Sequence, residues 1–202
     1  MTKPTARARG KPQPSYAPHR CVVVAVDPGD RAGWSIWVQG RLADFGELRG
    51  YDHEGAVKVV CAAQLLAELA EVDGERVSLP CVLVIERPFA ANLTTAAGMG
   101  AMRGVWLAAW ESGRESSRRV VLVYPAVWRS KVLPKGCASM KRELVRPIEQ
   151  RAAGLLVAGE LGAKRSESVG PDSAPAVLIG QWAGRAGEVA KKLPKRARAV
   201  AA

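Results

Sequence analysis

The sequence predicts an α/β fold with a mixed five-stranded sheet flanked by helices. Three short apolar runs, 21–26, 81–85 and 120–124, have the length and the β-branched content of strands buried on both faces. Predicted helices separate these runs, and such an alternation builds a parallel sheet with right-handed connections. We expect one domain over residues 21–184, between a disordered basic tail at 1–20 and a basic C-terminal tail at 185–202.

The remaining elements follow from local patterns. Residues 33–38 and 41–48 predict two more strands, joined by a tight turn at Gln39 and Gly40. Stretches 56–72 and 92–112 predict helices, and the second contains Gly98, Gly100 and Gly104. Glycine inside a helix costs roughly 1 kcal/mol against alanine. These glycines therefore indicate a close approach, either of another part of the chain or of a second subunit.

The C-terminal third predicts two helices. Ser139 is a candidate cap for a helix through 142–143, and Pro147 is expected to kink or end that helix within about two turns. Residues 162–170 are polar and predict a loop. Asp172 begins the last apolar stretch, 173–183, where Pro175 is tolerated because it falls in the first helical turn.

The net charge of +11 is concentrated at the two ends of the chain. Residues 1–20 contain no acidic side chain, and residues 185–202 contain only Glu188. This distribution favours a polyanionic partner such as nucleic acid, and the alternative is tails that serve solubility alone. The basic residues of the tails are Lys3, Arg7, Arg9, Lys11, Arg20, Arg185, Lys191, Lys192, Lys195, Arg196 and Arg198.

The cysteines and the hydropathy of the chain exclude several classes. The four cysteines are widely spaced, without a CxxC pair, so a zinc site is not expected. Neither a signal peptide nor a stretch long enough to span a bilayer is present, so we expect a reduced cytoplasmic protein without a membrane partner. The only histidines, His19 and His53, argue against Ser/His/Asp chemistry.

Acidic residues end two of the predicted buried strands. Asp27 and Glu86 each follow an apolar run, and ligands in open α/β sheets bind at the carboxyl ends of the strands. Such a carboxylate is expensive to desolvate unless it holds something, although Asp27 alone could simply cap a turn. Asp172 is the best third carboxylate, with helix capping as the alternative. Oxygen ligands of this kind suit Mg²⁺ or Mn²⁺, and two such ions can hydrolyse a phosphodiester.

Four segments resemble the successive motifs of RuvC-type Holliday-junction resolvases: VAVDPGDRAGWSIW, VIERPFAANLTTAAGMG, residues 124–141 and PDSAPAVLIG. The resemblance covers about residues 21–183 and implies an RNase H-like fold, a homodimer and Mg²⁺-dependent nicking of branched DNA. It further implies metal ligation and catalysis by Asp27, Glu86 and Asp172, a basic residue near the cleaved phosphate at Lys141, and DNA contacts at Asn92 and Thr95.

The sequence departs from the family pattern before the last helix. The family has a further acid three residues before the position of Asp172, where this chain has Val169, and the nearest substitute is Glu167. Trp128, Arg129 and Lys131 are candidate DNA contacts, because aromatic and cationic groups suit unstacked bases and phosphates. The alternative places Trp128 in the core, with the basic residues facing solvent.

The sequence is also compatible with two other functions. The first is a catalytically weak or inactive branched-DNA-binding protein of the same fold, which Val169 favours. The second is an ATPase of the actin and sugar-kinase type, since those proteins also begin with a strand ending in Asp-x-Gly. That class normally needs two such halves, and this chain fits one.

The basic tails give a testable expectation for DNA binding. Deleting residues 1–20 and 185–202 is expected to weaken the binding of a four-way junction. Each lost phosphate contact should reduce the steepness of the fall of log K with log salt by about 0.9. Fluorescence anisotropy over a salt series measures this slope. An unchanged slope would show that the tails do not contact the DNA backbone.

Overall fold

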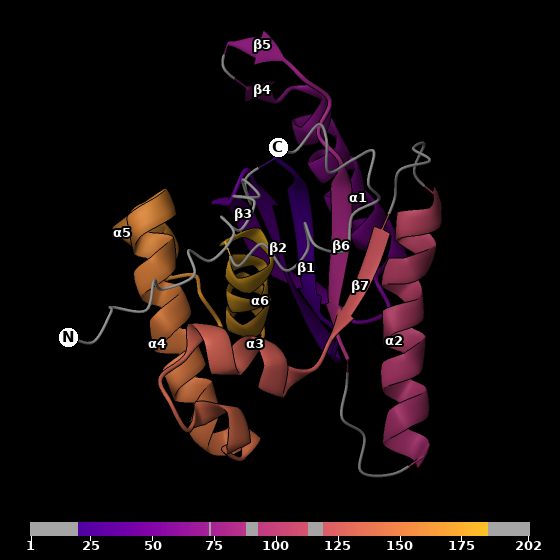
Figure 1. The fold of residues 1–202 in the computed structure, drawn as a ribbon. Helices are drawn as coiled ribbons and strands as arrows, with labels where there is room; N and C mark the ends of the chain where they lie inside the picture. Colours follow the sequence, from indigo (N-terminus) through magenta and orange to yellow (C-terminus); the bar gives the residue numbers. More distant parts are fainter. Residues whose placement is uncertain (1–19, 73, 88–92, 113–118, 186–202) are drawn as a thin grey trace, which may run out of the picture.

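The computed structural model describes residues 20–72, 74–87, 93–112 and 119–185. Its sheet has the strand order β3-β2-β1-β6-β7, in which β1 pairs antiparallel with β2 and parallel with β6 (Figure 1). The predicted mixed five-stranded sheet is therefore confirmed. The strands are β1 (Val22–Asp27), β2 (Arg31–Val38), β3 (Arg41–Arg49), β6 (Cys81–Glu86) and β7 (Arg119–Val123).

Helices cover both faces of this sheet (Figure 1). One face carries α1 (His53–Glu68) and α2 (Leu93–Ser112), and the other carries α3 (Pro125–Val132), α4 (Arg142–Leu161) and α6 (Ser173–Arg185). Smaller elements are the hairpin of β4 (Glu71–Val72) and β5 (Glu75–Arg76), the 3-10 turn η1 (Cys137–Ser139) and α5 (Ala163–Ser166).

The central strand β1 divides the core into two layers. Val22, Val24 and Val26 pack with α1 and α2, whereas Val23 and Ala25 pack with α4 and α6. This alternation follows from the opposite directions of successive side chains in a strand. Because β1 is buried on both faces, a charged residue at its end lies beside the core.

Helix α4 differs from the sequence expectation. It runs through Pro147 to Leu161, and its N-cap is Lys141 rather than Ser139. Proline removes one backbone hydrogen bond near the start of the helix, while the buried side chains of Val145, Ala153 and Val157 hold the rest against the core. The expected loop at 162–170 likewise contains the single-turn helix α5.

The described cysteines are free thiols, and burial raises the pKa of the Cys21 thiol to about 11. Within the described ranges, no helix combines the length and the apolar character needed to cross a membrane.

Val169 belongs to the hydrophobic core. Its side chain is 5% exposed and packs with the cluster that contains α4 and α6. That Val169 stands where the family has a metal-ligating acid stays a prediction, and we expect an acid at this position to be directed into apolar packing.

We expect Val169→Asp to lower the free energy of unfolding by roughly 3 kcal/mol or more, because it buries a carboxylate without a partner. Ser168→Asp adds the same charge at the exposed neighbouring position and should change stability by less than about 0.5 kcal/mol. Thermal denaturation of both variants tests this. Equal stabilities would mean that position 169 is accessible to solvent.

Candidate metal and phosphodiester site

Asp27 and Glu86 lie side by side at the edge of the sheet. The parallel register pairs Val26 with Ile85, so the next residues of β1 and β6 are the two acids. The prediction that they end neighbouring parallel strands is confirmed. Glu86 is 9% exposed, and both carboxylates line one cavity.

Asp172 reaches this edge because β2 has a glycine at the point of contact. Gly33 pairs with Asp27 across the sheet, and a Cβ atom on Gly33 would overlap the backbone carbonyl of Asp172. The next residue, Ser173, donates its backbone N–H to Glu47 Oε1 over 3.1 Å. A glycine on β2 and a carboxylate on β3 thus fix the start of α6 beside Asp27.

The body of α6 is held against the same strand. Ser35 Oγ donates to the carbonyl oxygen of Ala176 over 2.8 Å, and it accepts a hydrogen bond from Trp37 Nε1 over 3.1 Å. Gly180 leaves room for the Trp37 ring, since a Cβ atom there would overlap Nε1. These contacts are buried, so they resist displacement of the helix that follows Asp172.

Two adjoining cavities occupy this edge. The smaller has a volume of about 210 Å³ and is lined by residues that include Asp27, Glu86, Glu149 and Pro175. The larger, of about 420 Å³, is lined by residues that include Asp30, Arg31 and Asp172. Met99, Arg142 and Arg146 line both cavities, and Arg129 lines the smaller one.

Burial, together with the charges of neighbouring acids, weakens the acidity of the two strand-end carboxyl groups. Desolvation raises the pKa of Asp27 to about 6, and the charge of Arg142 opposes part of that rise. Desolvation, followed by the charge of Asp27, raises the pKa of Glu86 well above its ordinary value, and the hydrogen bond from Trp128 opposes this. The charged forms of both carboxyl groups are therefore poorly solvated at this edge.

The side chain of Trp128 is a core residue. It is fully buried in α3, and its indole Nε1 donates to Glu86 Oε2 over 2.7 Å. The expectation that Trp128 contacts DNA is corrected, since a buried ring has no face available to a base. Its hydrogen bond instead orients one of the two strand-end carboxylates.

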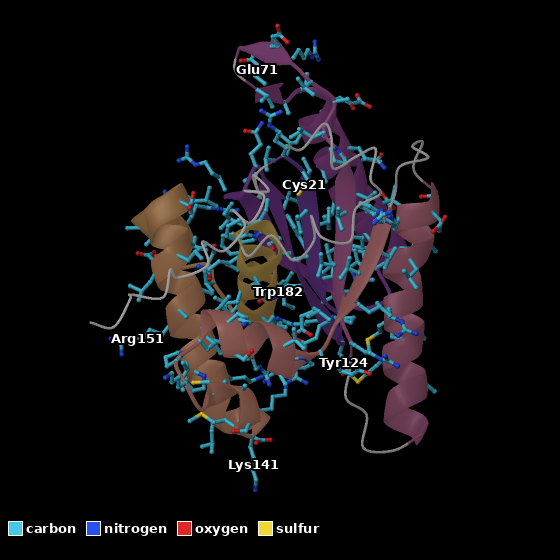
Figure 2. All side chains as sticks on the ribbon, in the orientation of Figure 1. Cys21, Glu71, Tyr124, Lys141, Arg151 and Trp182 are labelled. Carbon is cyan, nitrogen blue, oxygen red and sulfur yellow. The ribbon has the colours of Figure 1, made fainter. Side chains whose placement is uncertain are left out.

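The other predicted residues lie in different surroundings. Arg129 lines the smaller cavity, whereas Lys131 and Lys141 are exposed and line neither cavity, and Figure 2 shows the Lys141 side chain pointing away from the body of the protein. Glu167 is also exposed and lines neither cavity, so its replacement of a missing acid stays a prediction. Asn92 and the side chain of Thr95 lie outside the described residues.

Sequence reasoning missed Glu149, Arg142 and Arg146, which all project from α4. Glu149 is 1% exposed, and Arg146 Nη2 lies 3.4 Å from Asp172 Oδ1. A signal for Glu149 was present in the sequence: Val145, Glu149, Ala153 and Val157 follow a four-residue spacing, so an acid interrupts an apolar stripe.

The donor types at this edge fit a hard divalent cation. Asp27, Glu86 and Asp172 supply carboxylate oxygens, the ligands that Mg²⁺ and Mn²⁺ prefer, and burial leaves the first two poorly solvated. Within the described part of the chain, no three acidic, His or Cys side chains stand close enough to share one ion in the present arrangement. Guanidinium groups from α3 and α4 line the same cavities instead.

Comparison with known proteins identifies the fold. No protein-family model matches the sequence, and no match was found among curated proteins. Thermus thermophilus RuvC in complex with a Holliday junction substrate matches with a TM-score of 0.53 at 17% identity, over 84% of this chain and 96% of that chain. A second Thermus thermophilus RuvC structure matches with a TM-score of 0.51 at 19% identity, over 85% of this chain and 97% of that chain. The chain therefore has a RuvC-like fold, as the sequence motifs implied.

Proposed function

We propose that this protein is a divalent-metal-dependent endonuclease that nicks branched DNA such as Holliday junctions. Two buried carboxylates with raised pKa values, set beside three guanidinium groups at one sheet edge, carry this proposal. Carboxylates of this kind suit metal ions, and guanidinium groups suit phosphate oxygens. The RuvC-like fold supports a branched substrate, because one matching structure holds a Holliday junction.

Asp27, Glu86 and Asp172 are the residues that would hold Mg²⁺ or Mn²⁺. Such an ion supplies a more acidic bound water and stabilises charge on the phosphate. Trp128 keeps the carboxylate of Glu86 directed to the cavity, through the hydrogen bond from its indole. Arg142 and Arg146 present positive charge beside the carboxylates, where they would bind the phosphate oxygens and fix the scissile bond.

We also propose that the protein acts as a homodimer in the reducing cytoplasm. The free thiols agree with that compartment. Within the described chain, nothing approaches within 4 Å of the Cβ positions of Gly98, Gly100 and Gly104 on α2. Val120 and Leu122 on the edge strand β7 are exposed apolar residues. A second subunit would account for the glycines and for this apolar strand face together.

One observation favours the alternative of a branched-DNA-binding protein with weak catalysis. Pro175, which has no ligand atom in its side chain, lines the cavity beside Asp27 and Glu86. A cleavage assay separates the two functions: labelled four-way junction and linear duplex are incubated with the protein in Mg²⁺ and in Mn²⁺. Junction binding without nicking in either ion would support the alternative.

We expect Asp27→Asn to lower the rate of junction nicking by at least about 100-fold, since even the outer partners of metal sites contribute 10–100-fold. The variant should still bind the junction in Ca²⁺ with nearly the affinity of the wild type, because the amide is almost isosteric. Glu167→Gln, the same loss of charge at an exposed residue that lines neither cavity, is the matched control and should retain nicking. Wild-type rates in Asp27→Asn would exclude Asp27 as a metal ligand.

The raised pKa of Asp27 also predicts how stability depends on pH. A carboxyl group with a folded pKa of about 6, above its unfolded value near 3.8, takes up a proton on folding, so its unfavourable contribution develops as pH rises from about 4 through 6. In chelator at pH 8, Asp27→Asn should raise the free energy of unfolding by roughly 1–3 kcal/mol, and at pH 4 by much less.

Chemical denaturation at both pH values measures this difference, with Glu167→Gln as the control for loss of an exposed charge. Adding Mg²⁺ at pH 8 should stabilise the wild type more than Asp27→Asn, because the ion offsets the unfavourable buried charge of Asp27. If Asp27→Asn raised the free energy of unfolding as much at pH 4 as at pH 8, a folded pKa of about 6 for Asp27 would be contradicted.

A further inference from the structure

Arg129 and Glu149 form an ion pair within the protein. Arg129 Nε lies 2.7 Å from Glu149 Oε1, and the two side chains are 12% and 1% exposed. The hydrogen bond uses Nε, the nitrogen next to the side-chain stem. Among the described residues, this is the hydrogen bond that the guanidinium donates, so its two terminal nitrogens, which carry four of its five N–H donors, can serve another acceptor.

The guanidinium of Arg129 is placed at the smaller cavity. It lines that cavity with Asp27 and Glu86, and its central carbon lies 5.3 Å from the centroid of the Trp128 ring. Helix α3 therefore presents two consecutive side chains to the site. Trp128 holds the Glu86 carboxylate, and Arg129 brings a cation beside it.

Packing alone does not explain an acid at position 149. Glu149 stands among Val145, Ala153 and Val157 on the buried stripe of α4, where an apolar side chain would pack without a charge. Its charge also repels those of Asp27 and Glu86. A buried ion pair contributes little to stability compared with an apolar replacement, so this arrangement points to a function for the held cation.

We propose that Glu149 is a positioning residue that holds Arg129 in the cavity, so that the terminal guanidinium nitrogens bind the oxygens of a DNA phosphate. This inference rests on the proposed function, because it takes the cavity to be where a phosphodiester binds. Two neighbours, the Glu149 carboxylate and the Trp128 ring, fix the guanidinium before DNA arrives, which reduces the entropy lost on binding.

The direction of the change in DNA affinity distinguishes a positioning role for Glu149 from a purely electrostatic one. Glu149 is an acid near an anion site, so removing its charge should by itself strengthen DNA binding. Glu149→Gln and Glu149→Met remove the same charge and have similar volumes. The glutamine oxygen can still accept the hydrogen bond from Arg129 Nε, whereas methionine cannot.

The experiment measures junction affinity by fluorescence anisotropy in Ca²⁺, over a series of NaCl concentrations, for the full-length protein. Arg129→Met should bind roughly tenfold more weakly, with a salt slope lower by about 0.9, as for one lost phosphate contact. Glu149→Met should reproduce both changes, although it removes an acid. Glu149→Gln should keep the wild-type slope, and the double variant with Met at both positions should bind no more weakly than Arg129→Met.

Glu149→Asp keeps the charge but moves the carboxylate away from Arg129. It is the alternative variant if Glu149→Met does not fold, and it should reduce the steepness of the salt dependence in the same way. Slopes for Glu149→Met and Glu149→Asp equal to that of Glu149→Gln would overturn the positioning role, as would tighter binding by Glu149→Met. A wild-type protein that binds no junction would overturn the proposed function and this inference with it. Wild-type binding that is unaffected by position 149 overturns the inference alone.

Discussion

The burial of Asp27 and Glu86 side by side is the constraint around which the site is arranged. Adjacent parallel strands bring the two carboxylates to the same edge, beside a core that gives them little solvation. Such a pair persists only where other groups offset its charge. The Trp128 indole and the guanidinium groups of α3 and α4 provide that offset in the protein itself.

The same constraint explains why α6 is fixed so firmly. Asp172 adds a third negative charge near Asp27, so the segment that carries it needs strong attachment to the sheet. Gly33 permits the backbone contact, Glu47 accepts a hydrogen bond from the first residue of α6, and Ser35 binds its first turn. Each attachment comes from the β2–β3 hairpin. The antiparallel half of the sheet therefore supports a site whose first two acids lie on the parallel half.

Local patterns predicted the strands and the acids at their ends, because an apolar run followed by a carboxylate can be recognised from a few residues of sequence. The pattern of α4 marks Glu149 as an acid within an apolar stripe, but it could not give the role of that acid. The role depends on which face of α4 meets α3, and that contact joins residues 20 positions apart in the sequence. The burial of Val169 could not be predicted for a similar reason, since it depends on packing against α4 and α6. Pro147 does not end α4, although local propensity favours a break there, because tertiary packing holds the helix together.

Charge balance in the smaller cavity bears on how a metal ion and DNA would enter it. Among the described residues that line it, Asp27, Glu86 and Glu149 face Arg129, Arg142 and Arg146. A cation alone would meet the guanidinium groups, and a phosphate alone would meet the carboxylates. A cation and a phosphate together satisfy both sets, so each should bind more tightly in the presence of the other. A cavity of this composition favours the joint presence of metal and phosphodiester over either one alone.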